Sequence, residues 1–263
     1  MMKVLIVSGS PHRDGFCIKL SREIAKGIHE SGAEAELISL ADKNVDFCLA
    51  CRDAKCWAEM KCAREDDCID LRKKLNEAQA FAFLAPVYFL SINGLAKNFM
   101  DRMRYYGESG RPALAVSVAG GTGKGCILAL QDMCYWLLML GFRPIAVLPV
   151  TRYNFDLSLS EARIMGRRLA QSEPKQFRSL TDKISWYENL PYMRYNIVDE
   201  IAFLARIAIE GIARHGKPEL AAEPKEKLEK GLNLLNLGKY EDGLKLIVES
   251  HEDSMHIFNS LTS

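Results

Sequence analysis

The fold is decided by residues 2–17, which read MKVLIVSGSPHRDGFC. Residues 2–7 are apolar and rich in β-branched side chains, which is typical of a fully buried parallel strand. The Gly, Ser, Pro and Asp residues that follow interrupt regular structure, and apolar residues then recur at helical spacing from Ile18 to Ile28. The chain therefore begins as a strand, a tight loop and a helix. A loop of this kind is common, but it leaves backbone N–H groups at the start of a helix, where a phosphate can bind.

Composition places the chain among ordinary globular proteins. Its 263 residues suffice for one sizeable α/β domain with an addition, or for two small domains. Apolar residues make up 48% and charged residues 26%, and the net charge of +1 does not favour nucleic acid or an anionic membrane as a partner. No stretch has the pattern of a signal peptide or of a membrane span. We therefore expect a cytoplasmic protein without a nucleic-acid or membrane partner.

Four further apolar runs predict the other strands of a sheet, with helical patterns between them. The predicted strands are residues 33–40, 80–85, 113–119 and 145–150, and the predicted helices are residues 70–78, 95–106, 126–140 and 158–172. Five strands that alternate with helices predict a doubly wound α/β fold with a parallel sheet. Ligands of such sheets bind beyond the carboxyl ends of the strands, so the loops after the first, third and fourth strands form the candidate site.

The helical pattern changes after about residue 185. Residues 195–214, 224–237 and 240–258 predict three amphipathic helices. We therefore divide the chain into a domain of residues 1–180 and a helical extension of residues 185–263. The turn between the last two helices is similar to a tetratricopeptide-type hairpin, but one copy without a second repeat favours an extension that packs on the domain or on a second subunit.

Several motifs together resemble the NADPH-dependent FMN reductase and iron–sulfur flavoprotein families. The motifs are VSGSP at residues 7–11, Cys48-x2-Cys51 with later cysteines leading to Asp66-Asp67, APVYF at residues 85–89, and Lys97-x3-Asp101-Arg102. The resemblance covers about residues 1–170. It implies a flavodoxin-like five-stranded sheet with strand order 2-1-3-4-5, FMN as cofactor, and a homodimer or homotetramer.

The resemblance assigns the loop after the first strand to the FMN phosphate. Family members usually carry Arg after the Ser-Pro pair and then Gly-Asn-Ser or Gly-Asn-Thr, whereas this chain has His12 and lacks a hydroxyl at Cys17. Arg13 can supply the displaced charge, and backbone N–H groups can still bind the anion. The alternative is that this chain is a relative of the family that does not bind flavin. The phosphate residues implied by the resemblance are Ser10, His12, Arg13, Gly15, Phe16 and Cys17.

The loops after the third and fourth strands would border the isoalloxazine ring. A flavin needs a flat apolar or aromatic wall and backbone groups directed at its ring atoms, and Tyr88 and Phe89 can form such a wall unless they are simply core aromatics. Glycines allow close approach of the backbone to the ring. The ring residues implied by the resemblance are Pro86, Val87, Tyr88, Phe89, Ser91, Asn93, Gly94, Gly120 and Gly121.

Five of the eight cysteines lie within residues 48–68. Cys48, Cys51, Cys56 and Cys62 offer four thiolates, which is the number that a 4Fe–4S cluster requires. In iron–sulfur flavoproteins two residues separate the second and third cysteines, whereas four separate them here, and Cys68 is an additional thiol. Zinc would accept the same ligands, and a cluster-free relative would keep the cysteines as small buried residues. We predict a 4Fe–4S cluster on the first four.

The remaining cysteines and the histidines give no further site. Cys17, Cys126 and Cys134 are predicted to be core thiols. Of the five histidines, His12 is in the phosphate loop; the other four, on polar helical faces, are expected to face solvent. They are His29, His215, His251 and His256.

The resulting hypothesis is an FMN-dependent redox protein that passes electrons between a ferredoxin-like donor or NAD(P)H and a small acceptor such as a quinone or free flavin. The flavin performs the chemistry, so no catalytic acid or base is assigned. Two alternatives remain open. One is a cluster-free NAD(P)H-dependent flavin or quinone reductase. The other is a non-enzymatic flavodoxin-like protein that binds a partner through its C-terminal helices.

Overall fold

The computed structural model describes residues 2–52, 55–107 and 109–262. Its sheet has six strands, which are β1 (Lys3–Ser8), β2 (Glu34–Ser39), β3 (Ala80–Tyr88), β4 (Ser91–Ile92), β5 (Pro112–Ala119) and β6 (Arg143–Thr151). The strand order is β2-β1-β3-β5-β6, with every pair parallel, and β4 adds a two-residue antiparallel pairing to β3. The predicted order 2-1-3-4-5 is therefore confirmed once β4 is set aside.

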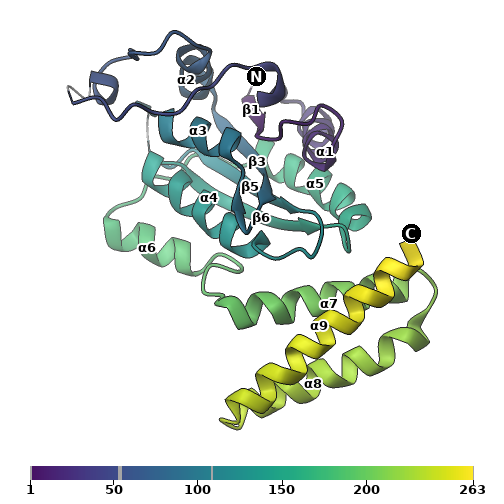
Figure 1. The fold of residues 1–263 in the computed structure, drawn as a ribbon. Helices are drawn as coiled ribbons and strands as arrows, with labels where there is room; N and C mark the ends of the chain where they lie inside the picture. Colours follow the sequence, from purple (N-terminus) through teal and green to yellow (C-terminus); the bar gives the residue numbers. More distant parts are fainter. Residues whose placement is uncertain (1, 53–54, 108, 263) are drawn as a thin grey trace.

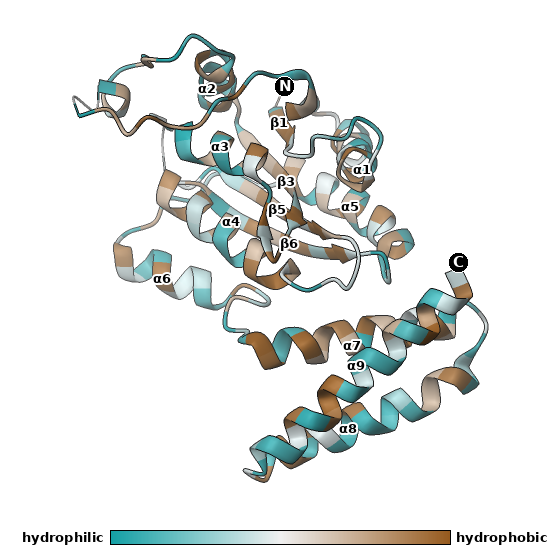
Figure 2. Ribbon diagram, in the orientation of Figure 1, coloured by the Kyte–Doolittle hydropathy of each residue, from teal (hydrophilic) through white to brown (hydrophobic). Residues whose placement is uncertain are grey.

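Helices cover both faces of the sheet (Figure 1). One face carries α1 (Phe16–Glu30) and α5 (Phe155–Ala170), and the other carries α2 (Cys68–Glu77), α3 (Gly94–Arg102) and α4 (Cys126–Leu140). Successive side chains of a strand point to opposite faces, so Val4 and Ile6 join the core under α1 and α5, whereas Leu5 and Val7 join the other core. Figure 2 shows the central strands β3 and β5 as mainly apolar, as expected for strands buried on both faces.

Strand β3 extends to Tyr88, three residues beyond the predicted end at residue 85. The N–H of Gly9 donates to Leu84 O at 2.7 Å, and β1 has ended at Ser8. Pro86 has no backbone N–H to donate. Because β1 has already ended at this level, the sheet loses no hydrogen bond there. The Pro86 carbonyl accepts the N–H of Asn93 at 3.1 Å, which closes the turn into β4.

Helix α3 is shorter than predicted, since it ends at Arg102 and not at residue 106. The carbonyl of Arg102 accepts a hydrogen bond from Arg72 Nε at 2.6 Å, and the backbone turns to an extended conformation at Met103. Helix α6 (Leu180–Glu188) was not predicted, and none of its residues is buried. Its Trp186 and Tyr187 pack against the core only partly buried, so the helix has a weak amphipathic pattern.

The C-terminal extension contains α7 (Ile197–Arg214), α8 (Ala222–Asn236) and α9 (Tyr240–Thr262). Short 3-10 helices lie at Leu40–Asp42, Lys55–Trp57 and Pro218–Ala221. The apolar core of the extension includes Ile127 of α4 and Tyr153 after β6, so the extension packs on the carboxyl edge of the sheet. The division at residues 180–185 stays a prediction. Among the described residues, no helix has both the length and the apolar character to cross a membrane.

Candidate functional site

Three loops meet at the carboxyl edge of the sheet, because β1, β3 and β5 are neighbours. They are the β1–α1 loop (residues 9–15), the turn of residues 88–94 and the glycine-rich loop (residues 120–125). Asn93 joins the first two, since its buried side-chain Nδ2 donates to Gly9 O at 3.0 Å. Its Oδ1 is buried without a hydrogen-bond partner among the described residues. The predicted loops are therefore adjacent, and one buried acceptor between them is left for a ligand.

The β1–α1 loop presents backbone more than side chains. Ser10 is buried and its Oγ accepts the N–H of His12 at 3.1 Å, while His12 itself is exposed. Arg13 donates through Nε to Asp42 Oδ1 at 2.6 Å, so its charge is already paired. Among the described residues, no side chain caps the N-terminus of α1, which follows Gly15, and the first turn of α1 has no acidic residue. Free N–H groups of this kind favour an anion.

Phe16 and Cys17 contribute to this loop through their positions in α1. The ring of Phe16 stacks on Phe155 with a centroid distance of 3.8 Å. Cys17 is buried, and burial raises the pKa of its thiol to about 12. Cys126 and Cys134 are buried as well, so the prediction of three core thiols is confirmed.

The turn after β3 is strained and exposed. Phe89 and Leu90 have φ angles of 46° and 71°, in the left-handed region that side-chain-bearing residues rarely adopt. Phe89 is 98% exposed and Tyr88 is 45% exposed, so both rings face outward and neither is a core aromatic. Strained residues persist where the surrounding structure holds them and often mark binding sites. The turn therefore presents two exposed aromatic rings at the sheet edge.

Glycines in the 120–125 loop fall into two groups. A Cβ added to Gly120 or Gly121 would meet no atom of the described residues within 4 Å, so these two border open space. A Cβ on Gly123 would lie 2.7 Å from the Leu204 side chain, and one on Gly125 would lie 2.4 Å from Leu90 Cα. The loop therefore packs against both the strained turn and the extension.

Residues of the extension hold the glycine-rich loop, and sequence reasoning missed them. Glu200 of α7 is 8% exposed, and its Oε1 accepts the N–H of Ile127 at 2.8 Å in the first turn of α4. This carboxylate occupies the anion site at the start of that helix. From the sheet domain, the hydroxyl of Tyr153 lies 3.5 Å from Gly121 O. Glu200 looks like a solvated residue of an amphipathic helix, so no sequence signal distinguished it.

His251 of α9 is buried at 1% exposure, and the expectation that it faces solvent is wrong. It lies against the glycine-rich loop, where it hydrogen-bonds the Thr122 backbone. Burial lowers its pKa below the ordinary value of 6.5, and the nearby charge of Lys124 lowers it further; the Thr122 bond and Glu252 oppose the shift. Figure 1 shows α9 next to this edge of the sheet. Burial at this position therefore favours the neutral form of the imidazole.

This burial predicts a pH dependence of stability. The unfolded chain takes up a proton on His251 more readily than the folded chain, so the free energy of unfolding falls as pH drops below 6.5 toward the lower folded pKa. Urea unfolding at pH values between 7.5 and 5 measures the effect. His251→Gln should reduce the loss, whereas His256→Gln, on an exposed position of the same helix, should leave it unchanged. Equal slopes in all three proteins would contradict the prediction.

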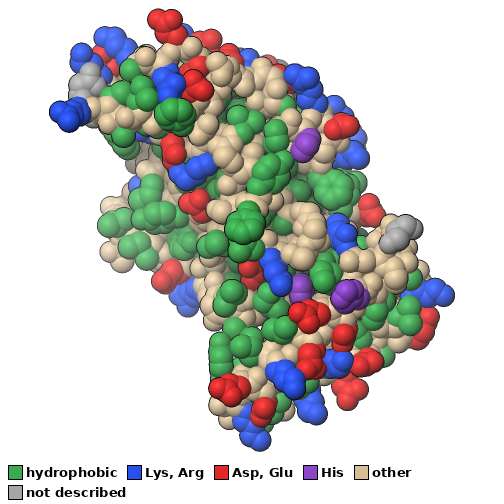
Figure 3. Space-filling view, viewed as in Figure 1, with side chains coloured by type: hydrophobic (Ala, Val, Ile, Leu, Met, Phe, Trp, Pro, Cys, Tyr) green, Lys and Arg blue, Asp and Glu red, His purple; other side chains and the backbone are tan. Residues whose placement is uncertain are grey.

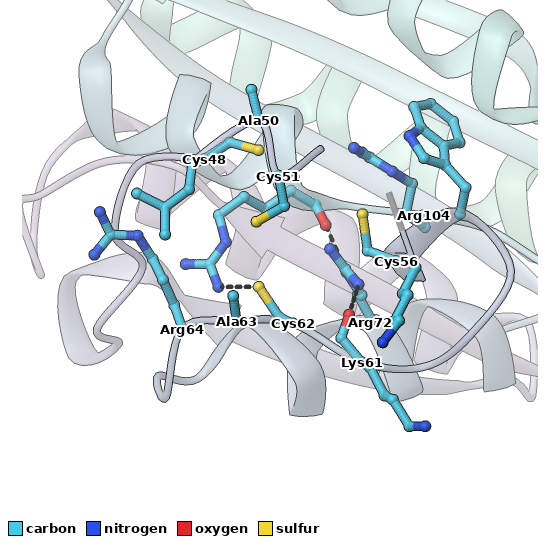
Figure 4. Close-up of a pocket in the computed structure, with 14 residues that line it drawn as sticks. Cys48, Ala50, Cys51, Cys56, Lys61, Cys62, Ala63, Arg64, Arg72 and Arg104 are labelled. Atoms are coloured by element: carbon cyan, nitrogen blue, oxygen red, sulfur yellow. Dashed lines mark hydrogen bonds between the residues drawn. The ribbon is translucent and has the colours of Figure 1, made fainter. Parts of the chain in front are cut away.

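The four predicted cluster cysteines line one cavity of about 270 Å³ (Figure 4). The cavity lies between the irregular segment after β2, the middle of α2 at Arg72 and the C-terminal end of α3 at Arg102. Cys68 is not among its lining residues; it is fully buried, with Sγ 3.7 Å from Arg102 O. Among the described residues, which omit 53–54, no three His, Cys, Asp or Glu side chains are close enough to form a metal site as they stand. The thiols are gathered but not in ligand geometry. The basic residues that line the cavity are Lys55, Lys61, Arg64, Arg72, Arg102 and Arg104.

Two buried charges organise the wall of this cavity. The side chains of Arg102 and Asp66 are each 1% exposed and form a two-bond pair, with Nη2–Oδ1 at 2.8 Å and a second bond from Nη1 to Oδ2. Nη2 also donates to Cys62 Sγ at 3.1 Å. Partial burial alone would raise the pKa of Cys62, but the Arg64 N–H and the Arg102 guanidinium bring it below its usual value. This wall of the cavity therefore favours the thiolate form of Cys62.

Comparison with known proteins gives the family of the chain. The model of the NADPH-dependent FMN reductase family matches residues 2–150. An iron–sulfur flavoprotein from Methanocaldococcus jannaschii is 31% identical over 188 residues, which cover 65% of this chain and 96% of that protein. An iron–sulfur flavoprotein from Archaeoglobus fulgidus is 32% identical over 129 residues, covering 47% of this chain and 57% of that protein.

A solved structure shares the fold. The NAD(P)H:quinone oxidoreductase from Methanothermobacter marburgensis has a TM-score of 0.52 and 18% identity, and the match covers 65% of this chain and 98% of that one. At this identity the likeness concerns the fold alone. The family match includes β1, β3 and β5 and the loops that follow them. This chain therefore belongs to the NADPH-dependent FMN reductase family, whose members are FMN-dependent oxidoreductases.

Proposed function

We propose that this protein is an FMN-dependent redox protein of the iron–sulfur flavoprotein type, which passes electrons between a ferredoxin-like donor or NAD(P)H and a small acceptor. The observation that carries the proposal is the gathering of four cysteines around one basic cavity, at the far end of a helix that begins at the flavin loops. Helix α3 starts after Asn93 and ends at Arg102. With nine residues it is about 13 Å long, so the two sites are close neighbours.

The three loops fit FMN. The uncapped N-terminus of α1 and buried Ser10 suit a phosphate, and the unpartnered Oδ1 of Asn93 suits a donor on the ring. Tyr88 and Phe89 offer the aromatic surface, and Gly120 and Gly121 leave open space beside it. Bound FMN would provide a group that can accept a hydride or single electrons. The other proposed contacts are His12, Arg13, Gly15, Phe16, Cys17, Pro86, Val87, Ser91 and Gly94.

The cysteine cavity fits a 4Fe–4S cluster in its donors and its charge. Cys48, Cys51, Cys56 and Cys62 supply four thiolates, and basic side chains surround them. The Nε of Arg102 is buried without a partner among the described residues, so one donor is left for a ligand. A cluster here would supply exchange of one electron at a time.

The fold also offers a surface for self-association. Leu128, Tyr135 and Met139 lie along one side of α4 and are about half exposed, at 54%, 57% and 46%. Ile184 of α6 is 50% exposed, and Figure 3 shows apolar side chains gathered over these two helices. Exposed apolar patches of this kind commonly mark interfaces. They support a homodimer or homotetramer.

An absorption spectrum of protein purified without oxygen tests the proposed function, with flavin, iron and acid-labile sulfide assayed on the same sample. We expect flavin bands above a broad brown shoulder and about four irons per chain. Flavin bands with neither iron nor sulfide would instead support the cluster-free NAD(P)H-dependent reductase, and zinc without sulfide would assign the thiols to that metal. A colourless sample that does not take up added FMN would refute the redox function and favour a non-enzymatic binding protein.

A further inference from the structure

Arg102 differs from the other arginines of the cysteine cavity, because it is buried, paired and bonded to a thiol. We propose that Arg102 and Asp66 together set the reduction potential of the cluster held by the four cysteines, with Arg102 as the positioning residue that donates a hydrogen bond to Cys62. The inference rests on the proposed function. It assigns to this pair a role that is distinct from ligation.

The guanidinium is fixed from several directions. Its Nη1 donates to Asp46 O at 3.1 Å in addition to Asp66, and Asp66 in turn accepts the N–H groups of Asp46 at 3.0 Å and Cys68 at 3.1 Å. Charge-assisted bonds with a planar fork hold such a side chain in one orientation. The donor that reaches Cys62 Sγ is therefore not free to rotate away.

The backbone that carries Cys62 is held by a second buried arginine. Arg72 is 1% exposed and donates through Nη1 to Lys61 O at 3.1 Å, while its Nε donates to Arg102 O at 2.6 Å. Arg72 thereby ties the residue before Cys62 to the end of α3. The distance between donor and thiol is set by both arginines, and Figure 4 shows Arg72 bonded to the backbone of Lys61, next to Cys62.

Electrostatics gives the direction of the effect. A cluster with four thiolate ligands is negatively charged, and reduction adds a further negative charge. A buried positive charge and a hydrogen bond to a ligand sulfur stabilise the reduced form more than the oxidised form, and thus raise the potential. The carboxylate of Asp66 opposes this effect through its own charge. Removal of the Arg102 charge should therefore lower the potential, and removal of the Asp66 charge should raise it.

The cavity provides a matched control in Arg104. Its guanidinium lies over the Trp57 ring at 4.0 Å and lines the same cavity, but it makes no hydrogen bond to a described cysteine. It is also only half buried. Arg104→Gln therefore removes the same charge from the same cavity without removing a sulfur contact.

The test is an EPR-monitored redox titration of the full-length protein after anaerobic reconstitution with iron and sulfide. Arg102→Gln should lower the equilibrium constant for reduction of the cluster at least tenfold, which is about 59 mV for a one-electron couple. Asp66→Asn should shift this equilibrium constant in the opposite direction. Arg104→Gln should change it by less than about threefold, which corresponds to less than half of the shift expected for Arg102→Gln. Iron and sulfide content is measured on each sample.

The outcomes separate this inference from the proposed function. Arg102→Gln leaves a buried carboxylate unpaired, which is strongly destabilising. If this variant does not fold or does not take up the cluster, the direction in which Asp66→Asn shifts the reduction potential tests the inference. Wild-type protein that takes up neither iron nor sulfide overturns the cluster and this inference together. A loaded cluster whose potential is the same in wild type and Asp66→Asn, or shifts equally in Arg102→Gln and Arg104→Gln, overturns this inference alone.

Discussion

Replacement of Cys51 by serine should abolish the iron and sulfide content of the purified protein and leave FMN bound. A cubane cluster needs four thiolates, and a serine hydroxyl, which stays protonated at neutral pH, does not replace one. Cys51 lies on the exposed part of the cysteine loop and does not contribute to the three loops at the sheet edge. The expected change is from about four irons per chain to none. Iron and sulfide assays measure it, with flavin released by denaturation counted on the same sample.

Cys68→Ser is the matched control for this variant. Cys68 belongs to the same cysteine-rich segment but is buried at the start of α2, with its thiol directed at the Arg102 carbonyl. Its replacement should leave the iron content unchanged, at a modest cost in stability. A Cys51→Ser protein with full iron and sulfide would show that the ligand assignment is wrong. If Cys68→Ser loses its iron and Cys51→Ser keeps it, Cys68 is the cluster ligand and Cys51 is not.

The strands and helices of the sheet domain could be predicted because their burial is nearly continuous. All eight residues of β5 are buried, and the predicted helix of residues 126–140 coincides with α4. Gly125 and Gly141, both left-handed, mark its two ends. Where burial is weak, the sequence has no clear hydrophobic pattern. Helix α6 has no buried residue, and the sequence did not predict it.

The loops of the candidate site could be predicted, but the partners of their side chains could not. Parallel strands end at one edge, so the loops after β1, β3 and β5 had to meet there. That Arg13 pairs with Asp42 depends on how the loop after β2 folds back, which no local pattern encodes.

The residues that hold the sites in place depend on contacts between distant parts of the chain. Glu200 bonds the start of α4, His251 packs on Thr122, and Arg102 pairs with Asp66. In the sequence Glu200 and His251 are polar residues with helical neighbours, which is the pattern of a solvated face. Asp66 and Arg102 belong to sequence motifs, but the motifs do not show that the two side chains pair. Only tertiary packing shows that these polar groups are buried, and burial is what gives each of them an electrostatic effect.

Gly125→Ala should weaken both the fold and FMN binding. The φ angle of Gly125 is 86°, and an added Cβ would lie 2.4 Å from Leu90 Cα. The β3–β4 pairing holds the turn of residues 88–91 in place, so one of the two backbones must shift. Left-handed strain together with this clash should lower the free energy of unfolding by about 2–4 kcal/mol. A shift of the turn moves Phe89 and should weaken FMN binding at least tenfold, or about 1.4 kcal/mol.

Gly238→Ala separates strain from the clash. Gly238, between α8 and α9, has a φ angle of 75°, but a Cβ there meets no atom within 4 Å, and the position is remote from the three loops. This variant should lose only about 1–2 kcal/mol of stability and bind FMN as the wild type does. Urea unfolding and quenching of FMN fluorescence measure the two quantities in both variants. If Gly125→Ala binds FMN with wild-type affinity, the strained turn has no role in holding the flavin. If Gly238→Ala weakens FMN binding equally, the loss in Gly125→Ala reflects general instability and not the contact between the glycine-rich loop and the turn.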